Sequence, residues 1–125
     1  MDEIVKELVE ICPVDDFGPG QTRIVDINNR SIGVFNVGGN FFALANLCPH
    51  AGGPLCRGQV TGTSVADKPY AVSWQRAGEI VRCPWHSWEF DIATGKTLTD
   101  PTRSVRTFKT VVKNGRLYIE TGASR

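Results

Sequence analysis

The sequence carries Cys48-Pro49-His50 in one stretch and Cys83-Pro84-Trp85-His86 in a second stretch further along the chain. Each stretch places one cysteine and one histidine at a spacing that lets both side chains converge on one point. Together they supply two thiolates and two imidazoles, which suits zinc or an iron–sulfur cluster with mixed ligation. The proline after each cysteine biases that cysteine towards extended backbone and stiffens the loop. The two stretches therefore predict a metal centre built from two loops.

A structural zinc site is the main alternative for these four side chains. Zinc sites with two Cys and two His ligands usually take both cysteines from one segment and both histidines from another. Here each loop contributes one of each, which favours an iron–sulfur cluster. The chain has only 2 His, and both stand at matching offsets from a Cys-Pro pair. The other two cysteines, Cys12 and Cys56, are expected to be buried thiols, as a lone cysteine most often is.

The segments around the two loops are typical of short strands joined by tight turns. Alternation and β-branched residues predict strands at residues 22–27, 31–37, 41–46, 105–113 and 116–121. In the second of these, Ile32 and Val34 share one face, while Phe35 and Val37 share the other. Asn114-Gly115 is a strong signal for a two-residue hairpin turn. These features predict a meander of antiparallel strands.

The secondary structure of two further segments depends on weaker patterns. Residues 3–11 fit a helix, but their apolar positions also alternate well enough for a strand. Residues 70–75 and 79–83 flank Arg76-Ala77-Gly78, which suggests a hairpin that returns the second loop beside the first. The loops themselves, at about residues 47–58 and 82–95, show little periodicity and are expected to be functional loops on a β scaffold.

Composition limits the class of protein. The chain has 125 residues and a mass of 13.7 kDa, with 41% hydrophobic and 22% charged residues, which fits one globular domain over residues 1–125. A net charge of +1 gives no basic field for nucleic acid, and no apolar run is long enough for a membrane helix. The acidic start Met1-Asp2-Glu3 is unlike a secretory signal, so we expect a cytoplasmic protein.

The two loops resemble the cluster loops of the Rieske family, in its bacterial, low-potential, soluble ferredoxins. The likeness lies in the residues from Cys48 to Leu55 and from Cys83 to Asp91. It implies an all-β fold, with a Rieske-type antiparallel β-sandwich base domain and a small cluster-binding subdomain formed by the two loops. It also implies one Rieske-type [2Fe-2S] cluster.

The resemblance assigns a role to each ligand of that cluster. Cys48 and Cys83 would hold the inner iron, whereas His50 and His86 would hold the outer iron. Pro101 sits where the family places a third loop over the cluster. An oxidised cluster with two thiolates and two neutral imidazoles sums to zero charge, against −2 for four thiolates, so it accepts an electron more easily.

The chain departs from the high-potential members of the family at several positions. No second cysteine stands between Cys83 and His86, so Cys56 lacks the disulfide partner of those members. Their cluster-facing hydroxyls fall at positions that Trp88 and Phe90 occupy here, and Ser87 is one residue away. We therefore expect a potential in the lower part of the Rieske range. Trp85 and Trp88 are expected to shield the cluster or to form an apolar docking rim.

The scarcity of histidine also bears on function. A Rieske oxygenase needs a second iron held by two His and a carboxylate, and both histidines of this chain are committed to the cluster. No Gly-x-Gly-x-x-Gly loop is present for a dinucleotide. The sequence thus predicts a one-electron carrier, not an enzyme. It would pass electrons from a flavin- or iron–sulfur-containing reductase to a terminal oxygenase or other oxidoreductase.

Two other functions stay open. The chain could be a tightly bound small subunit of a larger oxidoreductase, as in NADH-dependent nitrite reductases, or a binding module with structural zinc. The interval between the loops is longer than in many compact Rieske ferredoxins, with the excess within residues 61–78. That excess leaves the partner open.

Overall fold

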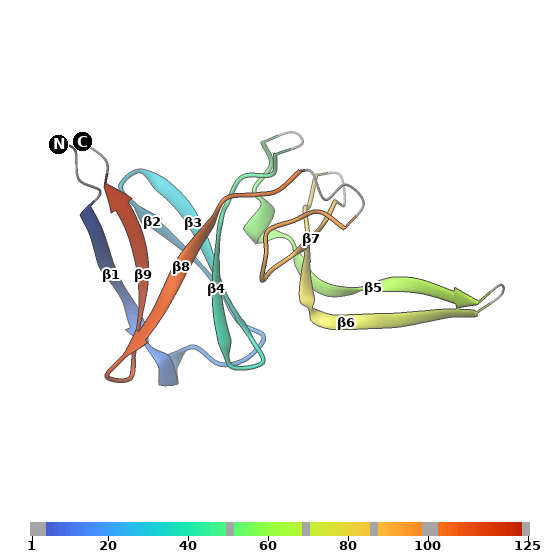
Figure 1. Ribbon diagram of the computed structural model, residues 1–125, viewed down its shortest axis with the longest axis horizontal. Helices are drawn as coiled ribbons and strands as arrows, with labels where there is room; N and C mark the ends of the chain where they lie inside the picture. Colours follow the sequence, from blue (N-terminus) through green and yellow to red (C-terminus); the bar gives the residue numbers. More distant parts are fainter. Residues whose placement is uncertain (1–4, 50–51, 69–70, 86–87, 99–102, 124–125) are drawn as a thin grey trace.

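The computed structural model of the chain describes residues 5–49, 52–68, 71–85, 88–98 and 103–123 (Figure 1). The fold is all-β, as expected, and every strand pair is antiparallel. The strands are β1 (Val5–Pro13), β2 (Thr22–Ile27), β3 (Arg30–Val37), β4 (Asn40–Ala45), β5 (Gln59–Lys68), β6 (Ala71–Arg82), β7 (Glu89–Asp91), β8 (Thr107–Lys113) and β9 (Arg116–Ala123). Two short 3-10 helices, η1 (Val14–Asp16) and η2 (Leu55–Arg57), complete the described elements. No helix in these ranges has the length and apolar character needed to cross a membrane.

Six strands form the base sheet, in the order β1-β9-β8-β4-β3-β2. Its two halves meet where β4 pairs with β8 at only two positions, Ala43 with Phe108 and Leu44 with Thr107. The ambiguous N-terminal segment is the strand β1, because it pairs with β9 along its length with one irregularity between Glu10 and Cys12. The expected hairpin at Asn114-Gly115 is present, with both residues at positive φ.

The strands β3 and β4 lie between two hydrophobic cores. We call the first the base core; it consists of Cys12, Phe17, Ile27, Ile32, Val34, Ala43, Leu117 and Ile119. The second, the loop core, consists of Phe35, Leu44, Cys48, Leu55, Cys56, Val81, Cys83, Phe90, Ile92 and Val105. The predicted alternation is therefore confirmed, with Ile32 and Val34 in the base core and Phe35 in the loop core. Because both faces of β3 are covered, the loops gain a rigid floor.

The strands β5, β6 and β7 form a second sheet, in that order. Beyond the short β7, the paired β5 and β6 run on as a ribbon that projects from the rest of the molecule (Figure 1). We call this projection the β5–β6 ribbon. It accounts for the long interval between the two loops.

The prediction of a hairpin turn at Arg76-Ala77-Gly78 is wrong. The strand β6 continues through these residues, and its pairing with β5 extends as far as Lys68 with Ala71. The three residues form an irregularity in the pairing, where Arg76 has φ +57° and Gly78 has φ +84°. The Arg76 guanidinium donates hydrogen bonds to Glu79, at 3.1 Å, and to Asp91 of β7. Arg76 and Gly78 do have the positive φ that is typical of a turn. Because β6 pairs with β5 on both sides of them, however, they form a bulge and not a hairpin turn.

Candidate metal centre

The first loop folds tightly around Cys48. The Cys48 N–H donates to the carbonyl of Gly53 at 2.8 Å, and the Gly52 N–H donates to the carbonyl of Cys48 at 2.8 Å. Gly52 has φ +75°, in the left-handed region that favours glycine. The Cys48 side chain is thereby turned into the loop core, where the residue is 2% exposed.

The second loop is closed in the same way. Cys83 follows β6 directly, and its N–H donates to the carbonyl of Trp88 at 2.8 Å. The pairing of Arg82 with Glu89 begins at this closure and continues into β7. Cys83 is 1% exposed and also lies in the loop core. In both loops, then, the cysteine N–H binds the carbonyl of the fifth residue after it.

The two loops contact each other at two glycines. A Cβ atom added at Gly58 would lie 1.7 Å from the carbonyl oxygen of Arg82, next to Cys83. A Cβ added at Gly53 would lie 2.8 Å from Cδ2 of Trp85. Both contacts require the absence of a side chain. The cysteine-bearing loops are thus held together by close backbone approach as well as by the β5–β6 pairing of Gln59 with Arg82.

The expected histidine ligands, His50 and His86, lie outside the described residues, as do Ser87 and Pro101. Within the described part of the chain, no three His, Cys, Asp or Glu side chains gather as a metal site. The structure therefore brings the two predicted cysteine ligands into one buried cluster of side chains. Two cysteines brought together in this way fit the predicted donor set, because the metal or cluster would balance the charge of thiolates that bind it among apolar residues.

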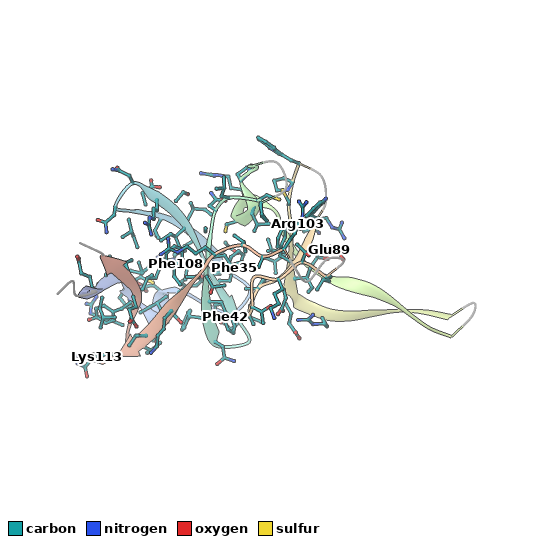
Figure 2. All side chains as sticks on the ribbon, turned by 45° about the horizontal axis from the view of Figure 1, so that its top comes forward. Phe35, Phe42, Glu89, Arg103, Phe108 and Lys113 are labelled. Atoms are coloured by element: carbon teal, nitrogen blue, oxygen red, sulfur yellow. The ribbon has the colours of Figure 1, made fainter. Side chains whose placement is uncertain are left out.

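The two tryptophans have different surroundings. Trp88 is partly buried against the loop core, and the Arg103 guanidinium lies 5.6 Å from its ring centroid. Figure 2 shows Arg103 and Glu89 close to each other, near the middle of the molecule. Trp85 is 57% exposed, despite its contact with Gly53. Of the two, Trp88 is the more buried and Trp85 the more exposed, and the shielding and rim roles stay predictions.

The described residues on either side of residues 99–102 lie beside the second loop. The Leu98 N–H donates to the carbonyl of Glu89 at 3.1 Å, and Lys96 forms a β-bridge with Ser104. The Thr97 N–H donates to the carbonyl of Arg103 at 3.1 Å. Residues on both sides of the expected proline-containing loop therefore lie beside the strand that leaves the second cysteine loop.

The remaining cysteines are buried thiols, as predicted. Cys12 belongs to the base core, and Cys56 belongs to the loop core. None of the four cysteines, all of which lie in the described ranges, forms a disulfide. Burial raises the pKa of the Cys56 thiol to about 12 from its ordinary value of 9.0. A thiol that stays protonated is a poor ligand and a poor nucleophile, so Cys56 has a packing role.

Two residues that support the first loop were not singled out from the sequence. A Cβ added at Gly33 would lie 2.2 Å from Cβ and 2.4 Å from Sγ of Cys56, so Gly33 makes room for that side chain. The Asn46 amide oxygen accepts from the Cys56 N–H at 2.8 Å, and its amide nitrogen donates to the Ser31 hydroxyl at 3.1 Å. Gly33 stands within an otherwise β-rich run, and a glycine at such a position can indicate that another segment approaches the strand closely.

The family model for the Rieske [2Fe-2S] domain matches residues 7–109 of the chain. A curated relative, the ferredoxin component of naphthalene 1,2-dioxygenase/salicylate 5-hydroxylase systems from a Ralstonia species, is 26% identical over 113 residues. The alignment covers 90% of this chain and 93% of that protein.

Two solved structures have the same fold as this chain. A ferredoxin of Sphingomonas yanoikuyae superposes with a TM-score of 0.68 at 26% identity, covering 92% of this chain and 99% of that one. A Mycobacterium tuberculosis protein named as an NADH-dependent nitrite reductase small subunit superposes with a TM-score of 0.68 at 23% identity. That superposition covers 98% of this chain and 99% of the other.

Proposed function

We propose that this chain, which belongs to the Rieske [2Fe-2S] domain family, holds one cluster on Cys48, His50, Cys83 and His86. Such a cluster takes up and releases one electron at a time. The observation that supports the proposal is the matched pair of loops, each closed at its cysteine N–H and each directing that cysteine into the loop core. We infer that residues 1–125 act together as one Rieske domain.

The chain is an electron carrier and not an enzyme. We propose that it accepts electrons from a flavin- or iron–sulfur-containing reductase and delivers them to a terminal oxygenase or another oxidoreductase. The support is the family membership together with relatives that are named as ferredoxin components of dioxygenase systems. Trp88 and the loop core would keep water away from the cysteine side of the cluster, which stabilises an uncharged centre over a charged one. A cytoplasmic location fits cysteines that form no disulfide.

Metal content and spectroscopy of the purified chain test this proposal. We expect about two iron atoms and two acid-labile sulfides per chain, a brown colour and an EPR signal that appears only on reduction. A colourless protein with one zinc per chain would show a structural zinc site instead. Uptake of two electrons per chain, instead of one, would contradict a single cluster.

A permanently bound subunit is the second candidate, and the β5–β6 ribbon favours it. From Thr63 to Gln75 the ribbon has only two strands in the described residues. An isolated two-stranded ribbon is at best marginally stable in water, so a permanent partner would stabilise it. Size-exclusion chromatography of the chain from its native cells separates the two. A diffusible carrier elutes alone, whereas a subunit elutes with its oxidoreductase.

A further inference from the structure

A hollow of about 430 Å³ lies beside the first cysteine loop. It is formed by the turn between β2 and β3, the segment that follows β4 and the residues at the start of β8. Figure 1 shows these three segments at the same end of the molecule. The residues that line it are Asn29, Arg30, Ser31, Ala45, Asn46, Leu47, Arg106 and Phe108. None of them is acidic.

The two arginines of this hollow differ from most others in the described chain. Arg76, Arg82 and Arg116 each form a salt bridge with a carboxylate. Within the described residues, the guanidinium groups of Arg30 and Arg106 have neither a hydrogen bond nor a salt bridge. Both residues are exposed. The hollow therefore carries two positive charges that the described chain does not neutralise.

One of these arginines is also held in place. The Arg106 guanidinium lies 4.9 Å from the centroid of the Phe108 ring, which restrains its position through a cation–π contact. The Arg106 backbone is fixed as well, because its carbonyl accepts from the Ala45 N–H at 2.9 Å. A guanidinium that is already ordered loses less entropy when it binds a carboxylate.

The hollow opens next to an exposed apolar side chain. Leu47 is 59% exposed and directly precedes Cys48. Ala45 and Phe108 add apolar surface within the hollow. Unneutralised arginines around an exposed leucine form a surface that fits a protein partner with acidic side chains around an apolar contact.

We propose that this hollow is the contact for an acidic surface of the chain's redox partner, whose carboxylates pair with Arg30 and Arg106. The inference rests on the proposed electron-carrier function and adds the chemistry of the partner. Exposed ion pairs of this kind contribute little to affinity, but they steer association and set its dependence on salt. The two arginines are thus expected to act mainly on the rate of encounter.

Two redox proteins of opposite charge serve as probes. Plastocyanin presents an acidic patch, and cytochrome c presents a basic one. Each accepts one electron from the reduced holoprotein, with no bond formed or broken, and each reports that transfer through its own absorbance in a stopped-flow experiment. The variants are Arg30→Glu, Arg106→Glu and, as a control with the same change of charge, Lys113→Glu. Lys113 ends β8, at the end of the base sheet away from the cysteine loops (Figures 1 and 2).

We expect Arg30→Glu and Arg106→Glu each to slow plastocyanin reduction about threefold to tenfold at about 0.01 M salt, and to speed cytochrome c reduction. Lys113→Glu should change either rate less than twofold. At about 1 M salt the variants should converge on the native rate, because the field is screened within a few ångströms. Arg106→Lys should keep most of the plastocyanin rate, because it keeps the charge.

Equal slowing by all three reversals would overturn the proposal, since net charge alone would then explain the rates. Unchanged rates in both arginine variants would overturn it as well. Arg30→Gln and Arg106→Gln, which remove one charge without adding another, provide a second series should a reversal fail to fold. The reduced-state EPR signal is recorded for every protein. Its absence from the native chain would contradict the proposed function, whereas its presence with unaffected rates would contradict only the docking surface.

Discussion

The indole of Trp85 lies against the backbone of Gly53, so the two cysteine-bearing loops meet at a position that has no side chain. Gly53 is buried, and its carbonyl accepts the N–H of Cys48 at 2.8 Å. Trp85 stands two residues after Cys83. The contact therefore couples the backbone that positions one predicted ligand to the loop that carries the other.

Substitution of Gly53 tests this coupling. In Gly53→Ala, the new methyl group would lie 2.8 Å from Cδ2 and 2.9 Å from Cγ of Trp85. The indole must move, and we expect a loss of about 1–3 kcal/mol of unfolding free energy together with lower iron content. Chemical denaturation and iron analysis measure the two effects.

Gly18→Ala is the matched control for this substitution. A Cβ at Gly18 would meet nothing closer than Gln21 Cδ at 3.9 Å, which is ordinary contact. It should leave iron content unchanged. The double variant Gly53→Ala/Trp85→Ala should recover part of the lost iron, because the clashing ring is gone. A Gly53→Ala protein with native stability and native iron would show that the loops do not depend on this contact.

The four cysteines should divide into two pairs on substitution. Cys48→Ala and Cys83→Ala should each reduce iron per chain to near zero, because each would remove a proposed thiolate ligand of the cluster. Cys12→Ala and Cys56→Ala should keep the iron and the EPR signal, with a stability loss of about 1–2 kcal/mol from the removed sulfur. Loss of the cluster on Cys56→Ala, in a protein that still folds, would place Cys56 among the ligands.

The buried thiol of Cys56 should make the chain less stable at alkaline pH. Its folded pKa of about 12 exceeds the ordinary value of 9.0, so between these values the folded state keeps a proton that the unfolded state releases. Stability from this group is therefore complete below pH 9 and falls as pH rises towards 12. The expected loss at pH 10 is about 1.4 kcal/mol.

Denaturant unfolding of the native chain and of Cys56→Ala at pH 8 and pH 10 measures this loss. The difference in unfolding free energy between the two proteins should shrink by about that amount over the interval. Parallel pH profiles would mean that Cys56 does not titrate differently in the folded and unfolded states.

The midpoint potential should lie in the lower part of the Rieske range of about −150 to +300 mV. Phe90 is fully buried in the loop core, and Trp88 packs against that core; neither has a hydroxyl to stabilise the reduced, more negative state. Voltammetry giving a midpoint above about +150 mV would contradict this account. His86→Cys should lower the potential further, since a thiolate adds negative charge. An unchanged potential in that variant would exclude His86 as a ligand.

The sequence alone predicted most of the scaffold that the structure shows, and the family to which the chain belongs. The predicted ligand types and their offsets, Cys48 to His50 and Cys83 to His86, are local features, and a short loop can display them without remote contacts. The alternation in β3 and the Asn114-Gly115 turn are also local, because side-chain direction and backbone propensity repeat within a few residues. The strand β1 was ambiguous, since only its pairing with β9 excludes a helix.

Tertiary structure decided what depends on residues far apart in the chain. The Gly33 contact with Cys56, the Gly53 contact with Trp85 and the bulge at Arg76 each need a partner from another segment. A bulge and a hairpin turn share the same residue types, and only the register of β5 against β6 distinguishes them. The hollow between Arg30 and Arg106 arises in the same way, because packing of the base sheet brings together two charges that the sequence leaves unrelated.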